Sequence, residues 1–168
     1  MTAVSANRDP AFCPGPTLVG LIAGSFNGTL FHHWYTTDDQ QQLQDSVEGG
    51  EKSCALYVSI LLQICGLLDG VYLDIDPLIE ALEANGWARG SGGMITSSIE
   101  VAVWGDEVGN RHIGFAFAAS PMAVSHSSFE GAPRRHPRTL RDGREIARRF
   151  THPQLTNLEK DLRLSGIL

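Results

Sequence analysis

The chain has 168 residues, of which 42% are apolar and 19% are charged, and its formal net charge at pH 7 is −6. This size and composition are typical of a single globular domain over residues 1–168, and they exclude a disordered or fibrous chain. Because 9 of the 13 Lys and Arg residues but only 4 of the 19 Asp and Glu residues follow residue 133, the protein is acidic with one short basic strip, which disfavours nucleic-acid binding.

The N-terminal third of the chain gives weak structural signals. Three prolines among polar residues predict that residues 1–16 form an irregular arm that wraps the domain. Residues 17–35 are apolar and aromatic but interrupted by glycines, which indicates a short strand or loops that line a cleft. The Gln-rich stretch 38–47 is typical of a short surface helix that ends at two glycines.

The strongest helix signal covers residues 53–68. Apolar residues recur there at the i, i+3, i+4 and i+7 spacing of one helical face. We expect Ser53 to cap the N-terminus of this helix and Gly66 to close its C-terminus.

A second helix is predicted with Asp76 as its N-cap and Pro77 at its first helical position. Gly86 follows just beyond its end. Three residues form its predicted buried stripe: Leu78, Ile79 and Leu82.

Strand character begins at residue 99. Residues 99–104 and 112–117 are rich in β-forming residues and predict a hairpin. Residues 122–127 supply a third strand, so the three segments together predict an antiparallel meander. Helices followed by such a meander define an α+β fold.

The C-terminal part of the chain is expected to return to loops and helices. Residues 131–137 are predicted to be a loop, residues 139–150 a basic helix and residues 155–164 another short helix. The basic segment is rich in arginine, whose forked guanidinium group suits carboxylates and phosphates, although a solvated helix face is the simpler interpretation.

Cys54 is the candidate nucleophile. A thiol attacks as the thiolate, and the unpaired N–H groups at a helix start stabilise that charge and contribute to an oxyanion hole. Cys65 lies three turns further on, near the opposite end of the helix, so we expect it to be an inert core thiol.

His112 opens the second predicted strand and is the expected base. Strand side chains alternate, so His112, Gly114 and Ala116 should share one face, and the small residues leave room for a substrate. A third polar group usually orients a catalytic imidazole. We expect His126 on the next strand to fill that role, or Ser125 if the register is shifted by one residue.

A structural interpretation of these residues also remains open. A cysteine on the apolar face of a helix is ordinarily a small core residue, and a strand histidine is ordinarily a surface or hydrogen-bonded one. The other four histidines carry no expected function, and neither a metal site nor a cofactor is predicted. These are His32, His33, His136 and His152.

Cysteine usage and the absence of long apolar stretches suggest where the protein is found. Three cysteines without zinc or disulfide spacing favour a reducing compartment. No segment approaches the length of a membrane span and no export signal is recognised. We therefore expect a protein that is cytoplasmic as synthesised, unless a signal-independent machine exports it.

The order of these motifs resembles the NlpC-type cell-wall peptidases of the papain-like superfamily. Residues 53–59, SCALYVS, are similar to the family's nucleophile helix, and residues 112–115, HIGF, to its base strand. Residues 103–106 resemble the strand and turn before the base, and residues 123–128 the strand that carries the third polar residue.

The resemblance implies a papain-like domain in which N-terminal helices, with the catalytic Cys54 at a helix start, pack on an antiparallel meander. It implies a cysteine hydrolase that cleaves amide bonds in peptidoglycan stem peptides, with His112 as base and His126 as the orienting residue. Its partners would be such a peptide or another amide substrate, and an inhibitory partner protein. The alternatives are a cysteine-dependent deamidase or acyl transferase on a non-wall substrate, and a non-catalytic binding module.

Overall fold

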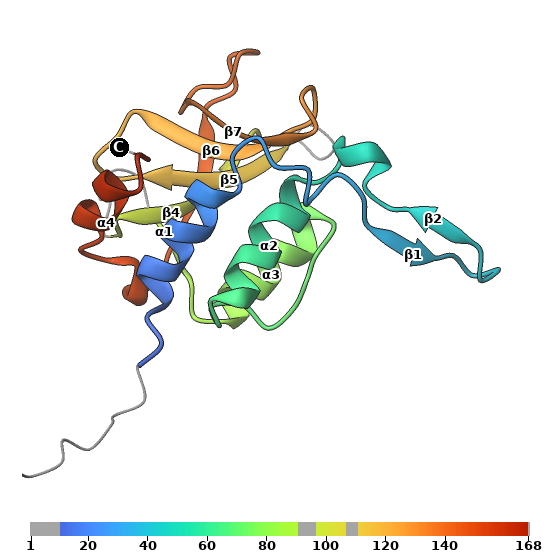
Figure 1. Cartoon of the computed structure of the whole chain (residues 1–168), viewed down its shortest axis with the longest axis horizontal. Coiled ribbons are helices and arrows are strands. Elements are labelled where there is room, and N and C mark those ends of the chain that lie inside the picture. The colour runs from blue at the N-terminus through green and yellow to red at the C-terminus, as the bar shows by residue number, and fades with distance from the viewer. Residues whose placement is uncertain (1–10, 91–96, 107–110, 168) are drawn as a thin grey trace, which may run out of the picture.

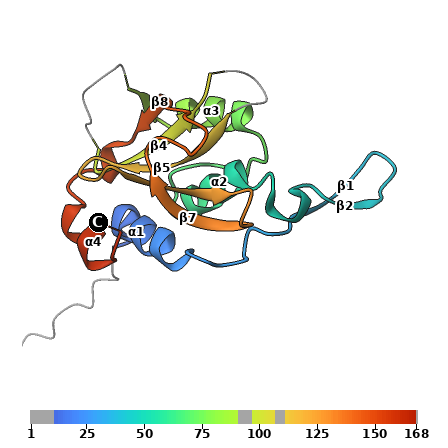
Figure 2. The same cartoon turned by 90° about the horizontal axis from the view of Figure 1, so that it is seen from above.

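The computed structural model describes residues 11–90, 97–106 and 111–167 (Figure 1). Helices and one large antiparallel sheet form the α+β fold that the sequence predicts. Helices α1 (Pro14–Gly24) and α2 (Cys54–Ile64) lie against one face of the sheet (Figures 1 and 2). No helix in these described ranges is long and apolar enough to cross a membrane.

The large sheet has six strands, and each neighbouring pair is antiparallel. In spatial order they are β3 (Ala88–Arg89), β8 (Ile146–Thr151), β4 (Ile99–Trp104), β5 (His112–Phe117), β6 (Met122–Ser127) and β7 (Ala132–Pro137). The meander β4–β5–β6 is confirmed with the predicted boundaries, because its alternating β-branched and aromatic residues suit a pleated sheet buried on both faces.

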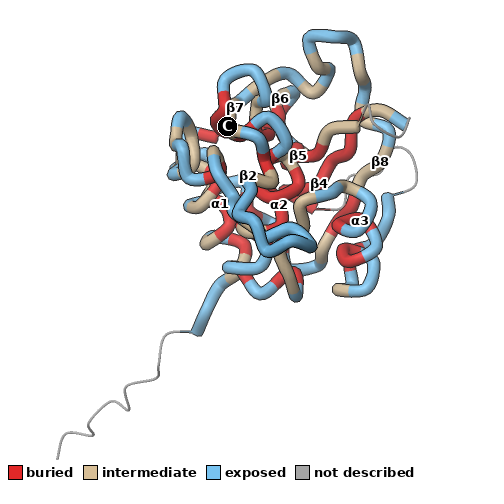
Figure 3. Tube along the Cα trace, turned by 90° about the vertical axis from the view of Figure 1, so that its right-hand side faces the viewer, coloured by how far each residue is buried: buried red, intermediate tan, exposed pale blue. Residues whose placement is uncertain are grey.

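The two faces of the sheet have different neighbours. Ile113, Phe115 and Phe117 join the main core beneath α1 and α2, as their alternation along β5 requires. On the other face Ala116 packs with Trp104 in a smaller cluster, which Leu140 and Ile146 cover. Figure 3 shows that α2, β4 and β5 hold much of the buried chain. His112 therefore belongs to the face that carries the smaller cluster.

Helix α1 replaces the predicted irregular arm and cleft loops over residues 14–24. Its two prolines, Pro14 and Pro16, occupy the first turn, where backbone N–H groups have no helical partner to lose. Gly20 and Gly24 are tolerated within it, and Leu18, one of its core residues, is fully buried. The first part of the predicted arm, residues 1–10, lies outside the described residues.

The predicted surface helix over 38–47 is wrong. That stretch instead belongs to a small hairpin of β1 (Tyr35–Thr37) and β2 (Leu43–Asp45), followed by the 3₁₀ turn η1 (Glu48–Gly50). Asp38 makes the turn, since its carboxylate accepts hydrogen bonds from the N–H groups of Gln40 and Gln42. The hairpin extends away from the body of the protein (Figures 1 and 2).

Helix α2 is confirmed, and Gly66 follows it in the left-handed conformation with φ of +64°. Ser53 holds the N-cap position but does not cap with its side chain. Its hydroxyl donates instead to the carbonyl oxygen of Phe31 at 2.5 Å.

Helix α3 (Ile75–Ala84) is also confirmed, with Leu78, Ile79 and Leu82 buried and Gly86 beyond its end. Its N-cap is Asp74, so the predicted N-cap, Asp76, falls inside the first turn. There the Asp76 carboxylate forms a two-pronged ion pair with Arg111, which precedes β5.

Two predictions for the C-terminal region are wrong. The predicted loop over 131–137 contains edge strand β7, which can hold Pro133 and Pro137 because one side of an edge strand has no partner. The predicted basic helix over 139–150 is a loop that leads into β8. The short final helix is present as α4 (Glu159–Leu164), preceded by the 3₁₀ turn η2 (Pro153–Leu155).

Candidate functional site

The structure places Cys54 at the first residue of α2, as predicted. Its side chain is half-buried against the main core. The hydrogen bond from buried Ser53 to Phe31 fixes the backbone just before it. Helix α2 packs on β5, and the Cys54 thiol lies near the backbone of Ile113, the second residue of that strand.

The electrostatic surroundings of the Cys54 thiol are mixed. Burial raises its pKa, and this effect outweighs the N–H groups of Ile113, Ala55 and Cys54 itself, which lower it, as does the charge of Arg144. The resting thiol is therefore protonated. Its contact with the Ile113 N–H places the sulfur beside the residue that follows His112.

Cys65 fits the core role that the sequence predicts. It is fully buried, and burial raises its pKa to about 11. It holds its proton at neutral pH and is an unreactive thiol.

His112 lies at the start of β5, and its ring is 5.9 Å from that of Trp104 on β4. Two residues further on, Gly114 allows β6 to approach closely. A Cβ added at Gly114 would lie 2.5 Å from the carbonyl oxygen of Val124 and 2.6 Å from the Cβ of Ser125. The space beside Gly114, which the sequence suggested as room for a substrate, is therefore occupied by the neighbouring strand β6.

A chain of hydrogen bonds runs from His112 across the next two strands. Nε2 of His112 lies 2.7 Å from Oγ of Ser125 on β6, and the same oxygen lies 2.8 Å from Nε2 of His136 on β7. Nδ1 of His136 in turn lies 2.7 Å from the carbonyl oxygen of Pro137. The Ser125 contact agrees with the alternative that the sequence left open, whereas His126, the favoured orienting residue, makes no such contact with His112. The inclusion of His136 was not expected.

Burial lowers the pKa of His112 to about 3, and the nearby His136 and Arg144 act in the same direction. Burial also lowers the pKa of His136. Both rings are therefore neutral near pH 7. Arg144 lowers the pKa of Cys54 as well, so one guanidinium group acts on both candidate catalytic residues.

The ring of His112 is hydrogen-bonded to Ser125 and not to His126. Gly114 pairs with Ser125, so strand alternation turns Ser125 to the face of His112 and turns His126 toward the main core. There His126 is 1% exposed, its ring lies 6.3 Å from that of Phe31, and it lies near the backbone of Gly131. Burial lowers its pKa to about 4.

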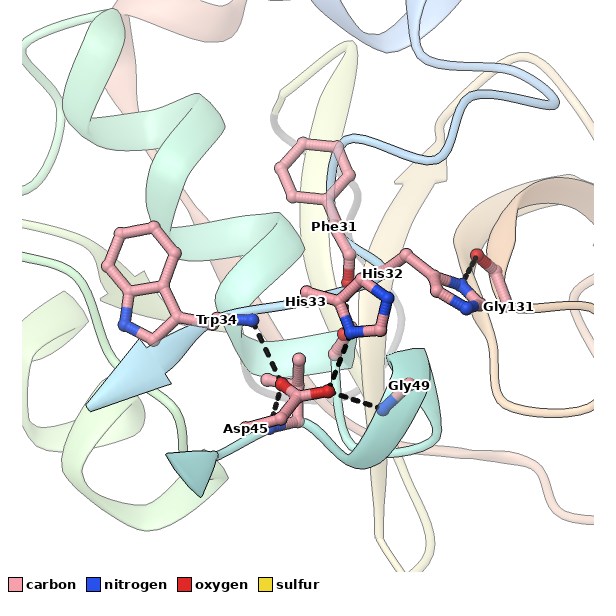
Figure 4. Close-up of polar contacts among 9 residues, drawn as sticks. Phe31, His32, His33, Trp34, Asp45, Gly49 and Gly131 are labelled. Atoms are coloured by element: carbon pink, nitrogen blue, oxygen red, sulfur yellow. Dashed lines mark hydrogen bonds and ion pairs between the residues drawn. The ribbon is translucent and has the colours of Figure 1, made fainter. Parts of the chain in front are cut away.

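A second polar network, which the sequence did not indicate, holds the base of the hairpin (Figure 4). The Asp45 carboxylate lies 2.7 Å from Nδ1 of His33 and accepts from the N–H groups of Trp34 and Gly49 at 3.0 and 2.8 Å. The bond with His33, followed by these N–H groups, holds the pKa of Asp45 far below its usual range. His32 points the other way, to the Gly131 carbonyl oxygen. These contacts give the pair of histidines a structural role.

An open pocket of about 540 Å³ lies beside His112. Ser125 and His136 also line it, together with four arginines of the basic strip: Arg134, Arg135, Arg141 and Arg144. Arg134 is paired with Glu130 and Arg144 with Asp142. Among the residues that line this pocket, His112 is present and Cys54 is not.

No family model, curated protein or solved structure matches the chain. Among the described residues there is no group of three or more His, Cys, Asp or Glu side chains suited to a metal ion. What the fold and site define is an α+β protein with a thiol at a helix start and a half-buried, neutral imidazole that is linked by hydrogen bonds across three strands.

Proposed function

We propose that this protein is a papain-like cysteine hydrolase that cleaves amide bonds, with Cys54 as nucleophile and His112 as base. The observations that carry the proposal are the position of Cys54 at the start of α2, which packs on β5, and the hydrogen bond between Ser125 and the ring of His112 at the start of β5. The resemblance of residues 53–59 and 112–115 to the NlpC-type peptidases supports the same assignment.

The neutral state of both groups determines the first step. His112 takes the thiol proton as the sulfur attacks the amide carbonyl carbon, so the ion pair forms during the reaction and is absent at rest. The Cys54 backbone N–H at the start of α2 stabilises the oxyanion. The His112 imidazolium then protonates the departing amine, leaving a thioester on Cys54. Water, deprotonated by His112, releases the acid and restores the thiol.

Peptidoglycan stem peptides are the proposed substrate class. The support is the motif resemblance, together with the open arginine-lined pocket beside His112, because these peptides carry free carboxylates that guanidinium groups bind. Deamidation or acyl transfer on a non-wall substrate uses the same pair of residues and differs only in the acyl donor and acceptor.

The test is digestion of purified peptidoglycan, followed by mass spectrometry of the released fragments. Wild-type protein should generate new free amines, and Cys54→Ala should generate none. Cys13→Ala is the matched control, because Cys13 is an exposed cysteine outside the site and its loss should leave activity unchanged. Products that persist in Cys54→Ala contradict the proposal.

A burst assay separates the chemistry from the choice of substrate. An activated ester such as p-nitrophenyl acetate should acylate Cys54 and release a stoichiometric burst of nitrophenolate, which His112→Ala should abolish. A burst without peptidoglycan cleavage favours the deamidase or acyl-transferase alternative. Absence of both favours a non-catalytic binding module in which Cys54 is a core residue.

A further inference from the structure

The hydrogen bonds around Ser125 determine where the protons lie. The Pro137 carbonyl can only accept, so Nδ1 of His136 carries a hydrogen and donates it. Because the His136 ring is neutral, its Nε2 is then unprotonated and accepts from the Ser125 hydroxyl at 2.8 Å. Ser125 has a single O–H, so it has no hydrogen left for its other neighbour.

The same reasoning fixes the tautomer of His112. Its Nε2 lies 2.7 Å from the Ser125 oxygen, which can only accept there, so Nε2 carries the ring proton. The neutral ring is left with an unprotonated Nδ1. One backbone carbonyl on β7 therefore sets the direction of donation along this series of hydrogen bonds, from His112 to Ser125 and from Ser125 to His136.

We propose that His136 is a positioning residue that acts through Ser125 and makes Nδ1 the basic nitrogen of His112. Two residues on adjacent strands thus fill the role that one polar residue was expected to fill. The catalytic part of this inference rests on the proposed function, whereas the tautomer does not. Without an acceptor at residue 136, the Ser125 hydroxyl is free to donate to Nε2 of His112, which moves the ring proton to Nδ1.

The experiment compares His136→Leu, which removes the acceptor, with His136→Gln, whose amide oxygen restores one. Long-range ¹H–¹⁵N NMR on protein labelled with ¹⁵N-histidine reads the tautomer of each ring at pH 7. We expect the Nε2–H form of His112 in wild type and His136→Gln, and the Nδ1–H form or a mixture in His136→Leu. Ser125→Ala interrupts the same series of hydrogen bonds at another residue.

Kinetics supply the second readout. In His136→Leu, kcat should fall by about tenfold or more while KM stays within about twofold, because loss of a residue that orients a catalytic histidine lowers kcat. His136→Gln should recover most of the rate. His33→Leu is the matched control, since His33 lies in the hairpin network, and it should change neither the His112 tautomer nor kcat.

Two results would overturn the inference: wild-type His112 with its proton on Nδ1, or an unchanged tautomer and kcat in folded His136→Leu. The two proposals fail separately. A tautomer switch in a protein with neither hydrolysis nor an ester burst contradicts the proposed function and leaves the hydrogen-bond direction established.

Discussion

Nη1 of Arg149 on β8 lies 3.1 Å from Oε2 of Glu100 on β4, and the Glu100 side chain is 1% exposed. Burial raises the pKa of Glu100, and Arg149 opposes that rise. A buried carboxylate costs several kcal/mol unless a cation accompanies it. The pair therefore explains why a segment as basic as the one before residue 150 lies within the sheet.

Removal of the Arg149 side chain should destabilise the folded protein. Arg149→Leu leaves the Glu100 carboxylate buried without its cation, and we expect the free energy of unfolding at pH 7 to fall by about 2–3 kcal/mol. Arg148→Leu is the neighbouring control, because Arg148 makes no side-chain hydrogen bond among the described residues. Chemical denaturation measures both. The idea fails if the two variants lose the same stability, or if adding Glu100→Leu to Arg149→Leu recovers none of it.

Gly114 should tolerate no side chain. The added Cβ of Gly114→Ala would meet the Val124 carbonyl oxygen at 2.5 Å, and such overpacking typically costs about 1–3 kcal/mol. Gly20→Ala in α1 meets nothing within 4 Å, so it should stabilise the protein by about 0.5–1 kcal/mol. The melting temperature should fall for Gly114→Ala and rise for Gly20→Ala. Equal shifts would contradict the close approach of β5 and β6.

His126 should make the fold sensitive to acid. Its pKa in the folded protein is about 4, below the ordinary 6.5, so the unfolded chain binds the proton more readily between those values. The stability that the neutral His126 side chain contributes is thus fully present above pH 6.5 and is lost as the pH falls toward 4. His126→Leu should reduce the drop in melting temperature between pH 7 and pH 5. A drop as large as that of the wild type would show that His126 is not responsible.

The pH dependence of hydrolysis should reveal the shifted base. His112 has a pKa of about 3, so it remains neutral and able to accept a proton well below pH 6.5. The value of kcat/KM should therefore change little from pH 7 to pH 5 while circular dichroism shows the protein to be folded. An unperturbed histidine would be only about 3% neutral at pH 5. A fall in kcat/KM centred near pH 6.5 would contradict a base whose pKa is lowered.

The parts of the fold that sequence predicts well are those with a regular apolar pattern. Helix α2 and strands β4, β5 and β6 have such a pattern, because each is buried against the core. Strands β7 and β8 have none, since their arginines and prolines are accommodated by an edge position and by the Glu100 partner, both of which are long-range features. Helix α1 was missed because prolines in a first helical turn look like loop residues.

The candidate site divides in the same way. Cys54 and His112 follow from their positions in predicted elements, and the structure brings the helix start to the strand start. The choice between Ser125 and His126 depends on a register that hairpin length alone does not determine. His136 could not be anticipated, because it reaches Ser125 from a strand that the sequence presents as a loop.

The position of β8 has a consequence for synthesis. This strand lies between β3 and β4, although more than forty residues separate it from β4 along the chain. As the chain emerges from the ribosome, one edge of β4, an apolar strand buried on both faces in the finished fold, has no partner until residues 146–151 appear. An open apolar edge is a site for strand pairing between chains. Chains truncated before β8 should therefore aggregate, whereas chains that include β8 cover that edge of β4 with their own arginine-bearing strand.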